Sequence, residues 1–513
     1  MKSNNKTIKF LPLIVLILTV VVLIVVIEVP NIFSKTKSKD NLLGAALIKE
    51  NALISGKSSN DKVSSDPSNK TANQNSGNNS SAGEQVEQPD SNNPAANISS
   101  EESQNSSSDS ALNSPGVQQD SSETAIKSEN INLDEIETMI KMYDYDRALK
   151  LLEKYPDQND ERVVGLNLDI KNGKNNAVLK NPLENMHIFF HSLIYDTAKA
   201  FDDDYKSGGY NQFMTTCLEF DRILEQLYER DYVLVAMHDL AKLETDENGN
   251  QVMVPGEIYL PENKKLLVLS VDDVNYYEYM AEDGFANKLV LDQNGNVTCS
   301  MINDQGMTVL GDYDVVPILD KFIENHPDFS YRGAKGILAL TGYEGALGYR
   351  TDESYRDLNP NYDADIAEAK KVAQALRDTG WEFASHSWGH LDMNTITFES
   401  FQQDADLWEK NVLPIIGETD IMIYPFGSPF SWSIEDYNYD NQRFAYLKQK
   451  GFDYFCTVDG SKNYTTSIKD DFLLQGRRNL DGYRMYYNPE LLDDLIDTDY
   501  VLDETRPLPV PPL

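Results

Sequence analysis

Short apolar runs alternate with amphipathic segments in the C-terminal part of the chain, from Met186 onward. The runs have the length and the β-branched and aromatic content of strands, and in chain order they read HIFFHSLI, YVLVAMH, KLLVLSV, GAKGILALTG, WEFASHS, DIMIYPFG and DYFCTVDG. Apolar residues recur at helical spacing in the segments 211–229, 314–325, 364–379, 398–412 and 439–450. This alternation predicts an α/β fold with a parallel sheet or a barrel. Functional residues of such folds gather at the carboxyl ends of the strands.

The segment 131–182 has a helical pattern of its own. Ile136, Met139 and Ile140 share one face of a first helix, and Pro156 marks the end of a second. The phrase YDRAL within that second helix resembles the start of the second helix of a tetratricopeptide repeat. A single repeat is rarely stable alone, so we interpret the segment as a helical hairpin packed on the next domain. A peptide-binding array is the alternative.

The N-terminal residues contain one long apolar run. Residues 10–27 read FLPLIVLILTVVVLIVVI, without a charge, and a bilayer span needs roughly 17–25 such residues. Because no small-residue cleavage site follows, we expect residues 1–30 to form a cytoplasmic stub and an uncleaved transmembrane signal-anchor. A cleaved signal peptide is the alternative. Lysines flank the run on both sides, but the large domain after it contains no second span, which favours a single-pass cell-membrane protein with its C-terminal domain outside the cell.

The composition divides the rest of the chain into three parts. Residues 31–130 hold a juxtamembrane segment followed by a stretch dominated by Ser, Asn, Asp, Gln and Lys. Such a stretch cannot bury enough apolar surface to offset its chain entropy, so we predict a disordered linker. Residues 183–500 then form the α/β domain, and the Pro-rich residues 501–513 form an extended tail.

Charge and cysteine content exclude several classes of function. The chain has 83 acidic and 45 basic residues, a formal net charge of -38, which opposes nucleic-acid binding because that requires a basic face. Three cysteines without a C-x-x-C motif exclude a disulfide framework and a cysteine-built zinc or redox site. The absence of G-x-S-x-G and G-x-x-x-x-G-K-[ST] motifs disfavours serine hydrolases and nucleotide-dependent enzymes.

Two clusters of polar residues directly follow predicted strands. KLLVLSV ends in Asp272 and Asp273, and burial of two adjacent carboxylates is costly unless a cation neutralises them. WEFASHS leads into His386 and His390, whose i,i+4 spacing suits a single metal ion held from one face. A pair of hydrogen-bonded structural histidines is the alternative. Ser387 stands where a zincin peptidase has its glutamate, which disfavours that class.

The phrases SVDDV, HSWGH and YPFGS, in this order at the ends of predicted strands, resemble the first three motifs of the polysaccharide deacetylases. This group, the NodB homology domain or carbohydrate esterase family four, has the motifs T-F-D-D-G, H-[ST]-x-x-H and x-x-P-[YF]-G. The resemblance covers roughly residues 186–485 and implies a distorted (β/α) barrel that removes N-acetyl groups from amino sugars with a divalent metal, Zn2+ first among the candidates. It assigns the following roles: metal ligands Asp273, His386 and His390, general base Asp272, and an oxyanion-binding backbone amide at Phe426.

The general acid of this family is usually a histidine late in the chain, yet no histidine follows His390. A permuted branch, similar to the biofilm poly-N-acetylglucosamine deacetylases, carries this histidine before the aspartate pair, in a phrase like M-Y-H-x-[VI]. HIFFHSLI resembles that opening and implies His191 as the acid, with His187 as the alternative. A histidine satisfied within the core is a further interpretation of His191.

Departures from the family motifs keep other functions open. Val274 replaces the motif glycine, and with the missing late histidine it supports a catalytically degenerate protein that only binds glycan. A glycosidase with two carboxylates is a third interpretation, but it leaves HSWGH unexplained. Arg477 and Arg478 lie where family members often carry an arginine, and either one of them orients Asp272 or both lie on the surface. We expect a membrane-anchored extracellular N-deacetylase whose partner is an N-acetylated glycan, peptidoglycan or a similar surface polymer, and not a nucleic acid.

Overall fold

The computed structural model describes residues 131–513 of the chain. The signal-anchor predicted within residues 1–30 and the linker predicted within residues 31–130 lie outside these residues. Within the described part of the chain, no helix has the length and apolar character that a bilayer crossing requires. Both N-terminal predictions therefore stay predictions.

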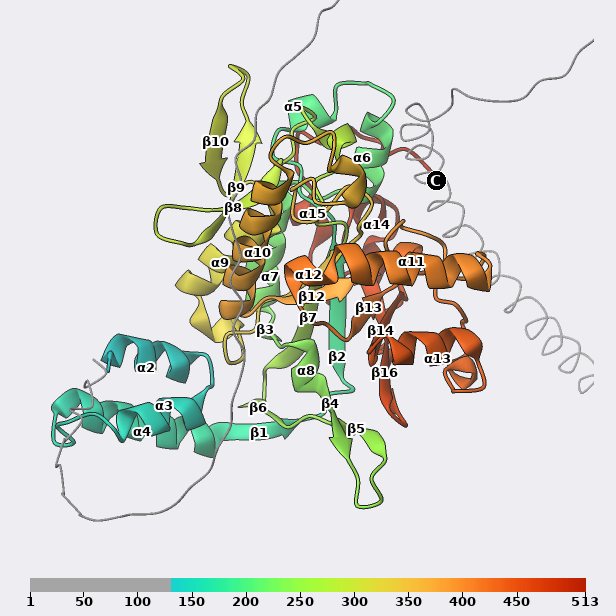
Figure 1. The fold of residues 1–513 in the computed structure, drawn as a ribbon. Coiled ribbons are helices and arrows are strands. Elements are labelled where there is room, and N and C mark those ends of the chain that lie inside the picture. The colour runs from blue at the N-terminus through green and yellow to red at the C-terminus, as the bar shows by residue number, and fades with distance from the viewer. Residues whose placement is uncertain (1–130) are drawn as a thin grey trace, which may run out of the picture. The chain divides into compact units, whose positions relative to one another are not determined.

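Seven parallel strands close into a barrel (Figure 1). In barrel order they are β11 (Ile337–Leu340), β12 (Glu382–Ser385), β13 (Ile421–Ile423), β14 (Tyr454–Val458), β16 (Phe472–Asn479), β2 (Asn185–Phe190) and β7 (Lys265–Val271), and β7 pairs again with β11. Some neighbouring strands are paired over a short length, since β12 and β13 share only the pair of Ser385 with Met422. The expected (β/α) barrel is confirmed, and its uneven strand pairing makes it a distorted one.

Six of the seven apolar runs become barrel strands. The exception, YVLVAMH, forms β3 (Tyr232–Leu234), which pairs with the beginning of β7. The seventh barrel strand, β16, has no counterpart among the predicted runs. Its sequence FLLQGRRN places Gln475 and Arg477 on the same face as Leu473, which packs inside the barrel, so the strand lacks an apolar pattern.

Helices and small antiparallel sheets surround the barrel. The helices of this domain are α5 (Thr197–Ala200), α6 (Ser207–Phe213), α7 (Cys217–Glu229), α8 (Met237–Leu240), α9 (Val315–Asn325), α10 (Tyr362–Asp378), α11 (Phe398–Asn411), α12 (Leu413–Ile416), α13 (Gln442–Gln449), α14 (Gly482–Tyr487) and α15 (Thr498–Val501). The small sheets pair β1 (Ala177–Lys180) with β6 (Ile258–Pro261), β4 (Ala241–Thr245) with β5 (Gln251–Pro255), and β9 (Val297–Ile302) with both β8 (Lys288–Leu291) and β10 (Thr308–Gly311). A short strand, β15 (Thr466–Lys469), runs antiparallel to β16.

The barrel strands are apolar on both faces because both faces are buried. Leu266 and Val268 of β7 pack inside the barrel, whereas Leu267 and Leu269 pack against the surrounding helices. This double burial is why the apolar runs in the sequence are nearly continuous.

Two helix boundaries show how local sequence determines the fold. Gly380 follows α10 with a φ of 102°, and a Cβ there would collide with the carbonyl oxygen of Gly333. The single helix predicted over 211–229 is wrong, because the chain forms α6 and α7 instead. Thr216 and Glu219 form a capping box that starts α7 anew, with each side chain accepting the other's backbone N–H.

The N-terminal described residues form three helices rather than the expected hairpin of two. They are α2 (Leu133–Lys141), α3 (Tyr145–Leu152) and α4 (Glu161–Asn176). These helices share a small core of their own and also contact the barrel domain. The Tyr143 hydroxyl donates to the carbonyl of Asp328 at 2.9 Å, and the Arg332 amide donates to the carbonyl of Met142 at 2.7 Å. The expected packing of this segment on the next domain is therefore present.

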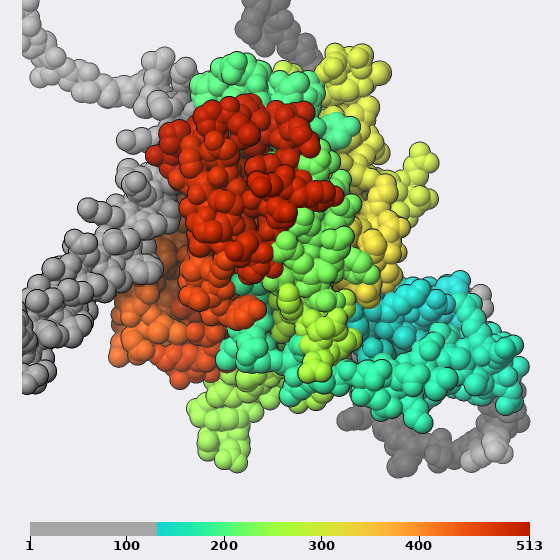
Figure 2. Space-filling model, turned by 180° about the vertical axis from the view of Figure 1, so that it is seen from behind, coloured from blue at the N-terminus to red at the C-terminus, as the bar shows by residue number. Residues whose placement is uncertain are grey.

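The Pro-rich residues 501–513 lie against the barrel domain. Asn211 of α6 donates through Nδ2 to the carbonyl of Pro507 at 2.8 Å, and the Tyr487 hydroxyl donates to the carbonyl of Val510 at 2.7 Å. Figure 2 shows the red C-terminal residues on one face of the molecule, beside the green segment that contains α6 and α7.

Candidate active site

All the residues that the motifs single out lie at one end of the barrel. Asp272 and Asp273 follow β7, His386 follows β12, and Phe426 lies in the turn after β13. His191 follows β2 directly. Because the barrel strands are parallel, their carboxyl ends meet at the same edge, and the polar groups converge there.

A cluster of three side chains can hold one metal ion. The ligand atoms of Asp273, His386 and His390 all lie within 4.8 Å of one another. Nδ1 of His386 lies 2.8 Å from the carbonyl oxygen of Ile423 and donates to it, which leaves Nε2 with a lone pair for a metal. Burial lowers the pKa of His390 to about 4, so its ring is neutral at pH 7. The donor set of one carboxylate and two imidazoles fits Zn2+ or a similar divalent ion.

Four residues in and beside the cluster have strained backbone conformations. Asp273, Ser387, His390 and Phe426 have φ values of 60°, 59°, 51° and 58°, in the left-handed region that non-glycine residues rarely adopt. Each such residue costs about 1–3 kcal/mol, and such residues concentrate at functional sites. The folded chain therefore holds these four residues in place by its packing.

A tyrosine outside the motifs orients the aspartate ligand. The Tyr277 hydroxyl donates to Oδ1 of Asp273 at 2.6 Å and shares a second hydrogen bond, also 2.6 Å, with Oγ1 of Thr341. Its ring stacks on Tyr343 with centroids 5.1 Å apart and an interplanar angle of 11°. The Oδ2 atom of Asp273 lies 3.6 Å from Nε2 of His390 and is thereby turned toward the other ligands.

We predict that Tyr277→Phe weakens metal binding about tenfold, the lower end of the usual effect when a ligand's supporting hydrogen bond is removed. The phenyl ring keeps the stack on Tyr343 while Asp273 loses its donor. Titration against a chromogenic chelator measures the change, with Tyr464→Phe, at an exposed position, as the control. An unchanged metal Kd in Tyr277→Phe would show that the hydroxyl does not hold Asp273 in its ligand orientation.

Asp272 is fixed by a buried arginine. Arg477 donates from Nη1 to Oδ1 at 2.7 Å and from Nη2 to Oδ2 at 2.9 Å, and the arginine side chain is completely buried. Burial alone would raise the pKa of Asp272, but the charge of Arg477 outweighs it and lowers the pKa to about 2. Arg478 instead binds Asp494. The alternative left open by the sequence is thus decided in favour of Arg477 as the residue that orients Asp272.

A chain of polar side chains inside the barrel supports this pair. Nη1 of Arg477 also donates to Oγ of Ser270 at 3.0 Å, and Nε2 of His187 lies 2.9 Å from the same oxygen. Nδ1 of His187 lies 2.8 Å from Oε1 of Gln475. Burial lowers the pKa of His187 to about 3. With both ring nitrogens bonded inside the barrel, His187 is a neutral core histidine and has no free nitrogen for a substrate.

His191 lies at the edge of the cluster and is partly exposed. Its ring interacts electrostatically with the carboxyl groups of Asp272 and Asp273. It interacts in the same way with Asp481, a buried residue just after β16 that the sequence does not single out. Burial raises the pKa of Asp481, and its Oδ1 accepts the amide of Arg484 at 2.7 Å. A prediction of β16 would have placed Asp481 at the functional end of the barrel.

Phe426 lies in a rigid turn beside the cluster. Its ring meets the His390 ring edge to face, with centroids 4.3 Å apart. The next two amides, of Gly427 and Ser428, donate to Tyr424 and Pro425 at 2.9 Å each. A Cβ on Gly427 would collide with Val458, so the turn admits only glycine there. The motif YPFG thus places Phe426 next to His390, one of the three candidate ligands.

Val274, the departure from the motif glycine, does not obstruct the site. Its side chain is buried in the core between the barrel and the helices. Its amide donates to Ala339 at 3.2 Å, and its carbonyl accepts the amide of Leu347 at 3.1 Å. The valine is accommodated by core packing, away from the ligand atoms.

No protein-family model matches the sequence, and no curated protein matches it. Among solved structures, the chain is similar to the deacetylase PplD of Streptococcus pyogenes, solved in complex with acetate, at 13% identity and a TM-score of 0.31 over 63% of this chain and 99% of that one. It is also similar to BA0330 of Bacillus anthracis, which carries the name of a polysaccharide deacetylase, at 13% identity and a TM-score of 0.32 over 59% of this chain and 65% of that one. At these values we base no functional argument on either likeness.

Proposed function

We propose that this protein is a metal-dependent hydrolase of the polysaccharide deacetylase type, which removes N-acetyl groups from an amino-sugar polymer such as peptidoglycan. The observation that supports it is the meeting of three kinds of group at one barrel edge. These are a ligand set for one metal ion, a buried carboxylate held by Arg477, and a partly exposed histidine, His191. Amide hydrolysis requires an activated water, an acceptor for its proton and a donor for the leaving amine.

The side chains divide this chemistry among themselves. A divalent ion bound by Asp273, His386 and His390 supplies polarisation of the acetamide carbonyl and a more acidic water. Asp272, kept ionised and oriented by Arg477, accepts the proton of the attacking water.

The remaining two groups serve the formation and the collapse of the tetrahedral intermediate. His191 gives a proton to the leaving nitrogen, which departs as the amine of the sugar. The Phe426 amide donates to the oxyanion as it develops, in a turn that is rigid before substrate arrives. Asp272 is bound to Arg477, and Asp273 is a ligand in the proposed metal site. This arrangement does not suit the flanking acid and base of a glycosidase.

Metal content and acetate release test the proposal together. We expect the purified full chain to bind about one equivalent of a divalent metal and to release acetate from N-acetylglucosamine oligomers or peptidoglycan only when loaded. His390→Ala is expected to lose both properties. His326→Ala, which removes a histidine that packs on Phe322 outside the cluster, is the matched control and is expected to keep both.

The outcomes separate the candidate functions. A chain that binds no metal even after Zn2+ is added back would contradict the proposal and favour the degenerate glycan-binding alternative. Metal binding without acetate release from any acetylated polymer would contradict the proposed reaction and support only the metal site.

A further inference from the structure

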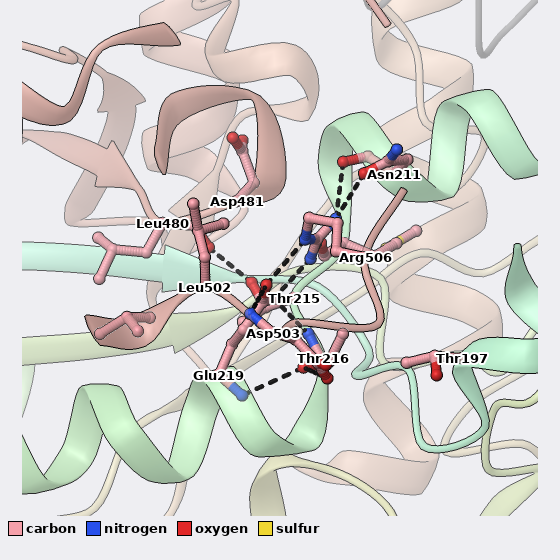
Figure 3. A network of polar contacts seen from close by, with 12 residues as sticks. Thr197, Asn211, Thr215, Thr216, Glu219, Leu480, Asp481, Leu502, Asp503 and Arg506 are labelled. Atoms are coloured by element: carbon pink, nitrogen blue, oxygen red, sulfur yellow. Dashed lines mark hydrogen bonds and ion pairs between the residues drawn. The ribbon is translucent and has the colours of Figure 1, made fainter. Parts of the chain in front are cut away.

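The C-terminal strap, residues 503–513, inserts one arginine into the barrel domain (Figure 3). Arg506 is completely buried, and all five of its N–H groups donate hydrogen bonds. Nε and Nη2 donate to the two carboxylate oxygens of Glu219, Nη1 donates to the carbonyl and side-chain oxygens of Asn211, and Nη2 donates also to the carbonyl of Met214. An arginine with every donor matched fixes the position of whatever it binds.

Glu219, the partner of Arg506, is equally buried and serves two elements at once. Its Oε2 accepts the amide of Thr216 at 2.8 Å in the capping box of α7, and its Oε1 accepts the amide of Asp503 at 3.1 Å. Asp503 in turn accepts the hydroxyl of Thr216 at 3.0 Å. The strap and the start of α7 are therefore joined in one network of hydrogen bonds.

The network clamps the α6–α7 junction, residues 214–216, which lies between the strand ends that carry His191 and Asp481. The Thr215 hydroxyl donates to the carbonyl of Leu480 at 2.7 Å, one residue before Asp481. The Thr215 carbonyl accepts the amide of Ile194 at 2.9 Å, three residues after His191. A single buried threonine thus ties both strand ends together.

Arg506 also packs directly on the residue after Asp481. Gly482 begins α14, and a Cβ there would collide with Nη1 of Arg506 and with the carbonyl oxygen of Asn211. The glycine lets the guanidinium press against the backbone that presents Asp481. The strap therefore reaches this part of the site by two independent routes.

We propose that Arg506 is a positioning residue, through which the C-terminal strap sets the placement of His191 and Asp481. This role in catalysis rests on the proposed function, whereas the effect on side-chain placement does not. Asp273, His386 and His390, the proposed metal ligands, follow β7 and β12, on other strands of the barrel, and among the described residues no hydrogen bond or ion pair joins them to this network. The hydrogen bonds of the strap therefore lead to the strand ends that carry His191 and Asp481.

The test compares Arg506→Gln with the wild type in the full chain. NMR signals of the histidine rings report the placement of the His191 ring. The signals of His191 are assigned as those that disappear in His191→Ala. We expect Arg506→Gln to move the His191 signals and to leave the metal Kd within about twofold of the wild type. For acetate release we expect kcat to fall about tenfold with KM nearly unchanged, since misplacement of a reacting group by less than 1 Å has effects of this order.

Two further variants keep the test decisive. Arg506→Lys retains the buried charge but cannot make the five bonds, so it is expected to show the same changes at a smaller size. It replaces Arg506→Gln in the test if that variant does not fold. Deletion of residues 508–513 removes the bonds of Gln212 and Tyr487 to the strap but keeps Arg506, and it is expected to leave the His191 signals as in the wild type.

Folded Arg506 variants with unchanged His191 signals would overturn the inference. So would a loss of metal binding together with shifts of every histidine signal, which indicates a general structural role. If the wild type releases no acetate, the proposed function fails, but the NMR comparison still decides whether the strap positions His191.

Discussion

Asp272→Asn is expected to reduce turnover by about 10²–10⁴-fold while the protein still binds its metal. General base catalysis contributes about 10²–10⁴-fold, and Asp272 is the carboxylate beside the ligand cluster that is not itself a ligand in the proposed site. Asparagine keeps the shape of the side chain but cannot accept the proton of water. Steady-state acetate release and metal content, measured on the same preparation, check both halves of the expectation.

The chain offers a matched control for this substitution. Asp494 also forms a bidentate pair with an arginine, Arg478, away from the cluster, so Asp494→Asn makes the same chemical change there. We expect Asp494→Asn to retain turnover. Asp273→Asn is expected to lose metal and activity together, which distinguishes a ligand from a base. Normal deacetylation by Asp272→Asn would show that the base is misassigned.

Arg477→Met is expected to destabilise the protein by about 3–5 kcal/mol at pH 7, the range for a buried ion pair that loses one partner. The side chains of Arg477 and Asp272 are 0% and 5% exposed, so the remaining carboxylate has little access to water. Urea unfolding measures the loss. Arg478→Met is the control and is expected to cost less, because its partner Asp494 is 33% exposed and stays hydrated.

The pH dependence of this loss follows from the pKa of Asp272. In the wild type the pKa falls from 3.8 to about 2 on folding, so the pair's stabilisation is fully present above pH 4 and is lost as pH falls toward 2. Without Arg477, burial raises the pKa of Asp272 above its unfolded value, and the variant then loses stability as pH rises. The difference between variant and wild type should therefore grow from pH 4 to pH 7. A difference that stays constant with pH, or one equal to that of Arg478→Met, would contradict this account.

The barrel was predictable from the sequence because its strands are buried on both faces. Runs such as KLLVLSV and WEFASHS can be recognised as strands from their own sequence. If the strands are parallel, the residues that follow them lie together at one end of the barrel. The ligand cluster of Asp273, His386 and His390 therefore appears where the motifs place it.

The parts that were not predicted depend on contacts between distant segments. β16 lacks an apolar pattern because Arg477 and Gln475 face the polar side chains of β2 and β7 across the barrel. Asp481 was missed with that strand. Tyr277 reaches Asp273 only through the fold of the loop after β7, for which the sequence has no periodic signal. The break between α6 and α7 is a local exception, since Thr216 and Glu219 carry a capping-box pattern that a continuous helical interpretation overlooks.

The left-handed backbone at Asp273, His390 and Phe426 has a consequence for assembly of the site. Folding of the barrel, and not the arrival of the ion, bears the cost of these conformations. An ion held by Asp273, His386 and His390 would then consume little of its binding free energy in ordering loops. If the proposed site binds an ion, we therefore expect the chain to stay folded without it, unlike small metal domains that unfold when the ion leaves.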